Sequence, residues 1–161
     1  MTSMALKRFS AAVVDSSPIM SIFEVRSSAK AFRQGLKKSD KLYMSAGTLM
    51  ELSVICIGKK SEAGTGPLDD LLNEFKIEIT PLDRPMVVHG RHECAKYGKG
   101  HNPADLKMGD LFSYSLAKSM DLPLYFKALD FPQTDNNDAM LMLGYAFDEK
   151  HSPNIPPTQS R

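Results

Sequence analysis

The chain is organised around one stretch, Tyr97-Gly98-Lys99-Gly100-His101-Asn102-Pro103-Ala104-Asp105-Leu106-Lys107-Met108-Gly109-Asp110-Leu111-Phe112-Ser113-Tyr114-Ser115-Leu116-Ala117. A loop rich in glycine, proline and basic residues runs here into an apolar segment with helical spacing. Asp110 stands at the junction, where a carboxylate caps free backbone N–H groups and suits the positive end of a helix dipole. Capping alone would explain Asp110, unless further acidic residues gather beside it.

Short apolar runs alternate with amphipathic segments along the rest of the chain. Strands are predicted over 9–14, 41–45, 77–80 and 124–127, and helices over 19–25, 27–38, 48–57, 68–75, 83–97 and from 110 onward. This alternation favours a parallel sheet covered by helices on both faces. The predicted fold class is therefore α/β, with a central sheet between two layers of helices.

Several boundaries follow from capping and breaking residues. Ser45 and Thr48 are candidate N-caps of the third helix, and Gly58 is its predicted stop. Residues 64–67 are predicted to break the chain, and 139–147 to form one further strand or a packing segment.

The length of 161 residues fits one domain. Residues 1–7 are predicted to be a flexible leader and 8–147 the folded domain. Residues 148–161 contain three prolines and few apolar residues, so we expect a disordered tail.

Charge and composition limit the function classes. The net charge of +1 gives no global signal for nucleic acid or for a membrane surface. No apolar run approaches the roughly 18 residues of a membrane span, and 11–14 is too short for a signal-peptide core. Cys56 and Cys94 lie far apart, which favours free thiols over a disulfide. We therefore expect a cytoplasmic protein.

Four acidic residues fall where the predicted topology brings segments together. Asp15 follows the first strand, Glu51 lies in the helix after the second, Asp110 opens a late helix, and Asp130 follows the strand after it. Right-handed crossovers collect such segments at one edge of the sheet. Converging carboxylates need cations, and oxygen ligands suit Mg²⁺ or Mn²⁺ better than zinc. Such sites commonly activate water for attack on a phosphodiester.

Each acidic residue also has a purely structural explanation. Asp15 and Asp110 are suitable helix caps, and Asp130 and Asp135 are suitable turn residues. Glu51 is hardest to explain in this way, because it interrupts an apolar helix where an unpaired charge is costly.

The segment 84–107 is locally basic and holds three of the four histidines. The candidate phosphate-binding residues within it are Arg91, Lys96, Lys99, His101 and Lys107. A basic segment that leads to an acidic metal site fits a polyanionic substrate. A solvated basic helix face is the alternative.

Four blocks, in this order, resemble the PIN-domain family, and within it the VapC toxins of bacterial toxin–antitoxin pairs. They are Val14-Asp15-Ser16-Ser17; Ser45-Ala46-Gly47-Thr48-Leu49-Met50-Glu51-Leu52; Tyr97 to Ala104 leading to Gly109-Asp110; and Leu124-Tyr125-Phe126-Lys127 with Asp130-Phe131 and Thr134-Asp135. The resemblance covers roughly residues 11 to 135. Leu111, Lys107 and Ala128 depart from the residues that many relatives carry, and none of the three is a proposed ligand.

The resemblance implies a PIN-like fold and a metal-dependent endoribonuclease whose catalytic and metal-binding quartet is Asp15, Glu51, Asp110 and Asp130. Asp135 would be an accessory ligand, and Ser17 would orient the first carboxylate. The carboxylates would hold Mg²⁺ or Mn²⁺, which activates a water for attack on the scissile phosphorus. The resemblance also implies an RNA substrate, a homodimer and a small VapB-like antitoxin partner.

Three alternatives stay open at this point. One is a PIN nuclease of RNA processing without an antitoxin, and another is a catalytically silent PIN-like binding module. The third is a phosphoryl-accepting receiver domain, which needs an acceptor Asp directly after the third strand, where this chain has Thr80-Pro81. The sequence does not identify the RNA target or the number of metal ions.

Overall fold

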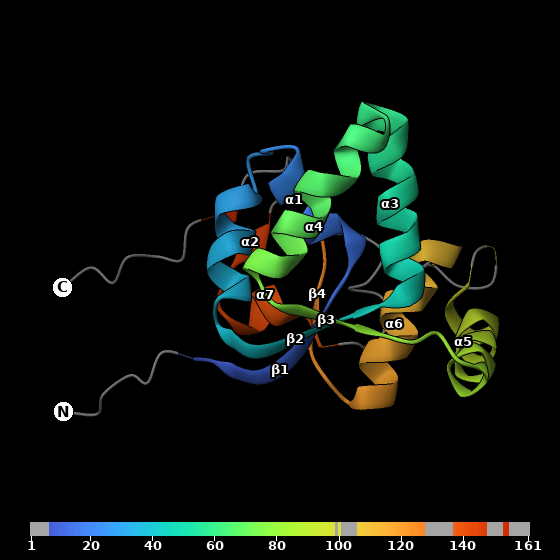
Figure 1. Cartoon of the computed structure of the whole chain (residues 1–161). Helices are drawn as coiled ribbons and strands as arrows, with labels where there is room; N and C mark the ends of the chain where they lie inside the picture. Colours follow the sequence, from blue (N-terminus) through green and yellow to red (C-terminus); the bar gives the residue numbers. More distant parts are fainter. Residues whose placement is uncertain (1–6, 99, 101–105, 128–136, 148–152, 155–161) are drawn as a thin grey trace, which may run out of the picture.

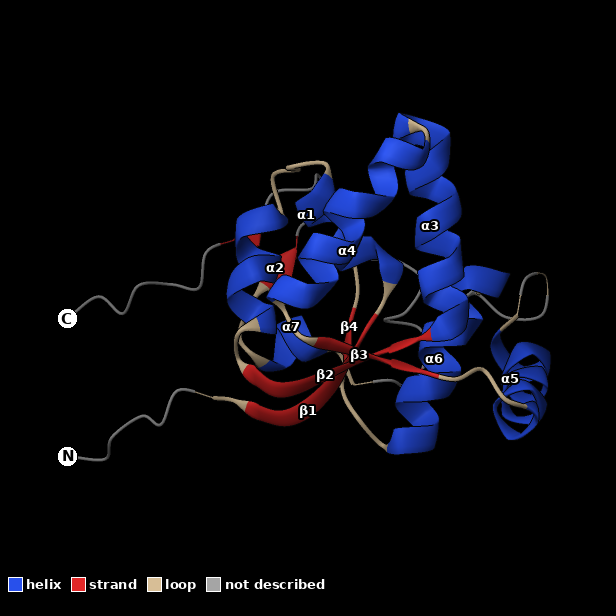
Figure 2. Cartoon of the chain, viewed as in Figure 1, coloured by secondary structure: helices blue, strands red, loops and turns tan. Residues whose placement is uncertain are grey.

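A four-stranded parallel sheet forms the centre of the protein (Figures 1 and 2). The structure, a computed structural model, describes residues 7–98, 100, 106–127, 137–147 and 153–154. The strand order is β3-β2-β1-β4. The strands are β1 (Phe9–Val14), β2 (Ser39–Ser45), β3 (Ile77–Thr80) and β4 (Leu124–Tyr125), and β5 (Ala146–Phe147) pairs separately with β6 (Pro153–Asn154).

Helices connect the parallel strands. They are α1 (Ser16–Phe23), α2 (Ala29–Leu36), α3 (Ala46–Lys60), the short 3₁₀ helix η1 (Glu62–Gly64), α4 (Thr65–Glu74), α5 (Arg84–Tyr97), α6 (Met108–Met120) and α7 (Ala139–Met142). In Figure 1, α2 and α7 lie to one side of the strands, and α5 and α6 lie to the other.

Side chains of β1 alternate between two cores. Ala12 and Val14 pack with the residues of α1 to α4 and with Tyr125. Val13 packs on the opposite face with α6, Leu124 and Phe126. Successive residues of a strand point to opposite faces, and all three β1 residues are fully buried. The sheet is therefore covered on both faces, which confirms the predicted α/β fold with a parallel sheet flanked by helices.

The order of the strands places the switch point of the sheet beside β1. The chain runs outward from β1 to β2 and β3, then returns to add β4 on the other side of β1. The register pairs Val13 with Leu124 and Val14 with Tyr125, so β1 and β4 end at the same edge. A crevice at such a point, outside the carboxyl ends of the strands, is where open α/β sheets bind ligands.

Two predicted breaks are wrong. Gly58 lies inside α3, which ends only at Lys60, because one glycine costs a helix about 1 kcal/mol. The helix ends where Ser61 takes a φ of 58°. The predicted break at 64–67 falls within η1 and the first turn of α4. Proline is tolerated in a first turn, because its missing N–H has no helical partner there.

The segment 139–147 is a helical turn followed by a short strand, so the alternative of one further strand is wrong and the alternative of a packing segment is correct. The Asp138 side chain accepts a 3.0 Å hydrogen bond from Leu141 N and caps α7. The apolar residues Ala139 and Met140 are fully buried. One capped helical turn therefore buries two of its four apolar side chains and leaves Leu141 and Met142 exposed.

Other predictions concern the chain ends, the thiols and the membrane. Residues 1–6 and most of the predicted tail lie outside the described residues, although Pro153–Asn154 pair with β5. Cys56 and Cys94 are free, as predicted. Within the described part of the chain, every helix is too short or too polar to cross a membrane.

Candidate active site

Asp15 is a buried carboxylate at the carboxyl end of β1, only 2% exposed. It caps α1, because its Oδ2 accepts hydrogen bonds from Ser17 N at 3.3 Å and from Ser17 Oγ at 2.7 Å. Its Oδ1 accepts a 2.6 Å hydrogen bond from Ser113 Oγ of α6. Both carboxylate oxygens are therefore held by hydroxyl groups, one from the next helix and one from the opposite layer.

The hydroxyl contacts extend beyond Asp15 in both directions. Ser113 Oγ lies 3.1 Å from Thr48 Oγ1 of α3, and both side chains are fully buried. On the other side, Lys127 N donates a 2.8 Å hydrogen bond to Ser17 Oγ. This network joins four segments of the chain around one carboxylate.

Ser113 and Thr48 were not predicted as site residues. The signal was present in their spacing, since Ser113 follows Asp110 by three residues and Thr48 precedes Glu51 by three. Residues three apart lie on the same helix face, so each hydroxyl stands one turn from a candidate ligand.

Glu51 of α3 comes close to Asp15 and to the first turn of α6. Burial raises the pKa of Glu51, the Asp15 charge raises it further, and a hydrogen bond with Ser16 opposes both. Its Oε2 is buried without a hydrogen-bond partner. A β-carbon at Gly109 would overlap the Glu51 carboxylate, so any larger residue there would displace the end of the Glu51 side chain.

Asp110 lies in the first turn of α6, at the third helical position. Its Oδ2 accepts a 2.9 Å hydrogen bond from Lys107 N, so the capping explanation is correct. Capping does not remove Asp110 from the site, because Ser113 and Gly109 of the same helix contact Asp15 and Glu51. The start of α6 therefore borders this site, together with the end of β1 and the helix α3.

The chemistry of the donors fits a hard divalent cation. Asp15 and Glu51 supply only oxygen atoms, and the unpartnered Glu51 Oε2 is an acceptor that a cation would satisfy. Within the described ranges, no three His, Cys, Asp or Glu side chains already form a group that could hold a metal ion. Asp130 and Asp135 lie outside the described residues.

The predicted basic segment coincides with α5 and the start of α6. Arg91, Lys96 and Lys107 are exposed, and Lys96 Nζ lies 4.8 Å from the centre of the Tyr97 ring. Lys99 and His101 lie outside the described residues. Tyr97 itself is buried and meets Tyr114 edge-on at 5.6 Å, so it packs in the core and does not offer a face to a base.

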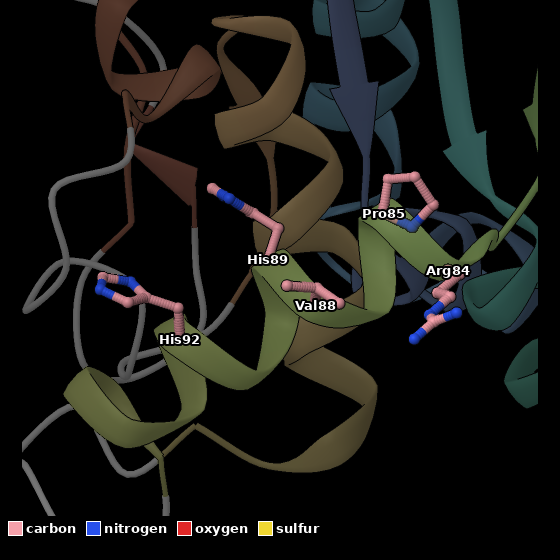
Figure 3. A pocket seen from close by; sticks show the side chains of 5 residues that line it. All are labelled: Arg84, Pro85, Val88, His89 and His92. Atoms are coloured by element: carbon pink, nitrogen blue, oxygen red, sulfur yellow. The ribbon is translucent and has the colours of Figure 1, made fainter.

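A shallow hollow of about 590 Å³ runs along α5 (Figure 3). It is lined by Arg84, Pro85, Val88, His89 and His92. His89 and His92 project from the same side of the helix, and each approaches the buried Glu93 carboxylate, at 4.0 and 3.4 Å. The hollow lies on one helix and away from the hydroxyl network around Asp15.

The receiver-domain alternative does not fit this site. Asp83 is the acidic residue nearest to the end of β3, and its Oδ1 accepts a 3.0 Å hydrogen bond from Met86 N as the N-cap of α5. Asp83 is exposed and follows the edge strand β3, two strands away from β1 and Asp15, so it is poorly placed to accept a phosphoryl group in this site.

Comparison with known proteins defines the class. The model of the PIN domain family matches residues 12–136. VapC ribonuclease Mb2780c of Mycobacterium bovis is 32% identical over 124 residues, which cover 76% of this chain and 95% of the relative. Ribonuclease VapC30 of Mycobacterium tuberculosis is 29% identical over 123 residues, which cover 76% of this chain and 94% of the relative.

Solved structures share the fold. VapC20 of Mycobacterium tuberculosis, described as a sarcin-ricin loop cleaving toxin, superposes with a TM-score of 0.62 at 10% identity and covers 75% of this chain and 92% of its own. VapBC2 of Rickettsia felis, bound to a DNA fragment from its promoter, superposes with a TM-score of 0.60 at 18% identity. The match covers 80% of this chain and 96% of the solved chain.

The chain therefore belongs to the PIN-domain family. Within that family it groups with the VapC ribonucleases, whose sequences it matches over nearly their whole length.

Proposed function

We propose that this protein is a metal-dependent endoribonuclease and the toxin of a toxin–antitoxin pair. The observation that carries the proposal is the approach of Asp15 and Glu51 at the switch point of the sheet, with Glu51 Oε2 buried and unpartnered. Asp15 is buried and Glu51 is half-buried beside it. Two such carboxylates close together repel each other, and a divalent cation relieves that repulsion. Catalytic residues in this proposal are Asp15, Glu51, Asp110 and Asp130, with Asp135 as an accessory ligand.

The residues have distinct roles. A bound Mg²⁺ or Mn²⁺ would activate water and stabilise charge on the phosphate. Ser17 and Ser113 fix the two oxygens of Asp15, so this carboxylate needs no reorganisation when the cation and substrate arrive. Gly109 lets Glu51 approach the start of α6, where the free N–H groups of the first turn favour negative charge.

The substrate and partners follow from the same proposal. Arg91, Lys96, Lys99, His101 and Lys107 would contact RNA phosphates as the strand approaches the start of α6. Relatives with solved structures include complexes described as toxin–antitoxin or VapBC assemblies, which supports a VapB-like antitoxin as partner. We also propose a homodimer in the cytoplasm, and the free thiols fit a reducing compartment.

The deciding experiment is cleavage of a structured RNA pool by purified protein in Mg²⁺, in Mn²⁺ and in EDTA. Asp110→Asn, prepared identically, controls for contaminating nuclease. We expect cutting that needs the metal and is absent from the variant. Equal cutting by the variant, or cutting in EDTA, would exclude the proposed chemistry.

If no cleavage is seen, calorimetry with Mn²⁺ distinguishes an inactive protein with an intact metal site from a protein that has no metal site. Protein freed of any copurified inhibitor should bind Mn²⁺, and Glu51→Gln should bind it more weakly. If inhibitor-free wild type bound no Mn²⁺, the metal site itself would be refuted.

A further inference from the structure

Lys127 lies beside the acidic site, directly after the carboxyl end of β4. Its backbone N–H is tied to Ser17 Oγ at 2.8 Å, one hydroxyl away from Asp15. Asp15 and Lys127 therefore lie on either side of the switch point. They follow β1 and β4, the two parallel strands between which the strand order reverses.

The Lys127 side chain is half-buried next to another cation. Burial lowers the pKa of Lys127, and the charge of Arg26 lowers it further. Among the described residues no carboxylate pairs with the Lys127 ammonium group. Two neighbouring cations repel each other, and partial desolvation of one of them raises the free energy of its charged form. A bound anion would offset both effects.

Arg26 continues the positive surface toward the end of α3. Arg26 and Lys59 both bind the same carboxylate, Glu24, with Lys59 Nζ at 2.6 Å. Lys60 Nζ lies 4.9 Å from the centre of the Phe23 ring. We name Arg26, Lys59, Lys60 and Lys127 the α1 basic strip; Glu24 neutralises part of its charge by binding Arg26 and Lys59.

The four cations of the strip lie at the two ends of α1, whose middle residues are buried. Lys127 is anchored at the first turn of that helix, and Glu24 with its two cations lies at the other end. The eight residues of α1 span about 12 Å. In Figure 1, α1 and α3 stand together beyond the sheet, on the side where β1 ends.

Ordinary surface stabilisation explains only part of the strip. Lys59 and Lys60 suit the negative end of α3, and Glu24 neutralises one charge. Neither reason applies to Lys127, which belongs to no helix and is desolvated beside Arg26.

We propose that the α1 basic strip binds the phosphates of the RNA strand on one side of the scissile bond. This inference rests on the proposed ribonuclease function and adds a second phosphate-binding surface to the one predicted on α5. An RNA backbone fits because it presents successive negative charges along a line, and the strip begins at the acidic site where the strand is cut.

The test measures RNA binding as a function of salt. The probe is a short single-stranded oligouridylate, with EDTA present so that nothing is cleaved. The variants are Lys127→Gln, Arg26→Gln and their combination. Lys127→Gln keeps the backbone N–H that holds Ser17, so the acidic site retains its hydrogen bonds. Lys41→Gln, an exposed cation on β2, is the matched control, and thermal unfolding checks each fold.

We expect the double variant to bind RNA at least tenfold more weakly at low salt. The slope of log K against log salt should become shallower by about 0.7 for each RNA phosphate that the variant no longer neutralises. Lys41→Gln should bind like the wild type, and Lys127→Arg should retain most of the affinity.

Three outcomes would overturn the inference. If wild type cleaves RNA with metal but the double variant binds with unchanged affinity and slope, the strip is refuted and the ribonuclease stands. If poly-glutamate binding falls while RNA binding does not, the strip serves an acidic protein surface. If wild type neither binds nor cleaves RNA, the proposed function fails and the inference fails with it.

Discussion

The Ser113 hydroxyl donates a 2.6 Å hydrogen bond to Asp15 Oδ1, joining residues that are 98 positions apart in the chain. Both side chains are buried, and Ser113 also contacts Thr48, so the hydroxyl links α6, α3 and the end of β1. Removing one donor from a buried carboxylate costs free energy, because water cannot replace it. This bond therefore supports the fold as well as the orientation of the first carboxylate.

Ser113→Ala should lower the free energy of unfolding by about 1–3 kcal/mol, the range for removing a partner from a buried charged group. Urea unfolding followed by circular dichroism measures the loss. Ser119→Ala on the same helix is the control, since Ser119 is exposed and bonds only its own helix, to Leu116 O. Equal effects of the two substitutions would show that the Asp15 contact contributes nothing specific.

Gly109→Ala should damage the site although alanine normally favours a helix. A β-carbon at Gly109 overlaps the Glu51 carboxylate, so Glu51 must move. Gly66→Ala is a matched control, because Gly66 also occupies the second position of its helix and has nothing within 4 Å. We expect Gly66→Ala to stabilise the protein by about 0.5–1 kcal/mol and to leave Mn²⁺ affinity unchanged. Gly109→Ala should stabilise the protein less and reduce its Mn²⁺ affinity, because the end of the Glu51 side chain must move. Equal stabilisation by both substitutions with unchanged Mn²⁺ affinity would contradict the crowding of Glu51.

Glu51→Gln should abolish cleavage without loss of stability. The substitution keeps the shape of the side chain and removes a half-buried negative charge that lies near Asp15. Unfolding experiments should show a free energy equal to that of wild type or about 1 kcal/mol higher. Loss of both cleavage and folding would mean that Glu51 is a structural residue.

Tyr125→Phe tests a buried hydroxyl away from the acidic site. Tyr125 Oη donates a 2.7 Å hydrogen bond to Gly35 O and lies 3.0 Å from Ser39 Oγ. Phenylalanine leaves the Gly35 carbonyl without this donor, so we expect a loss of about 1–2 kcal/mol at neutral pH, measured by urea unfolding. Tyr43→Phe is the control.

The same residue predicts a pH effect. Burial raises the pKa of Tyr125 to about 12, above its ordinary value of about 10. The fold favours the neutral phenol, so its contribution is complete below about pH 10 and is lost as the pH rises toward about 12. Between about pH 10 and pH 12 the free energy of unfolding should fall more steeply with pH for wild type than for Tyr125→Phe. Parallel curves would contradict the raised pKa.

The predictable part of the fold came from local patterns. The apolar run 9–14, the alternation of 77–80 and the helix predicted over 83–97 appear in the structure as two strands and α5. One error lies where a single residue was given too much weight, because Gly58 does not stop α3. The apolar character of 139–147 left a strand and a packing segment open and did not predict the capped helical turn.

Local patterns in the chain were enough to predict the α/β class, the four family blocks and the candidate roles of Asp15, Glu51 and Asp110, because spacing and residue type are local properties. Only the tertiary structure showed three further relationships. They are the return of β4 beside β1, the contacts of Ser113 with Asp15 and Thr48, and the approach of Lys127 to Arg26. These relationships join residues far apart in the chain. Their physical basis is the packing of two helical layers on the sheet, which no local pattern encodes.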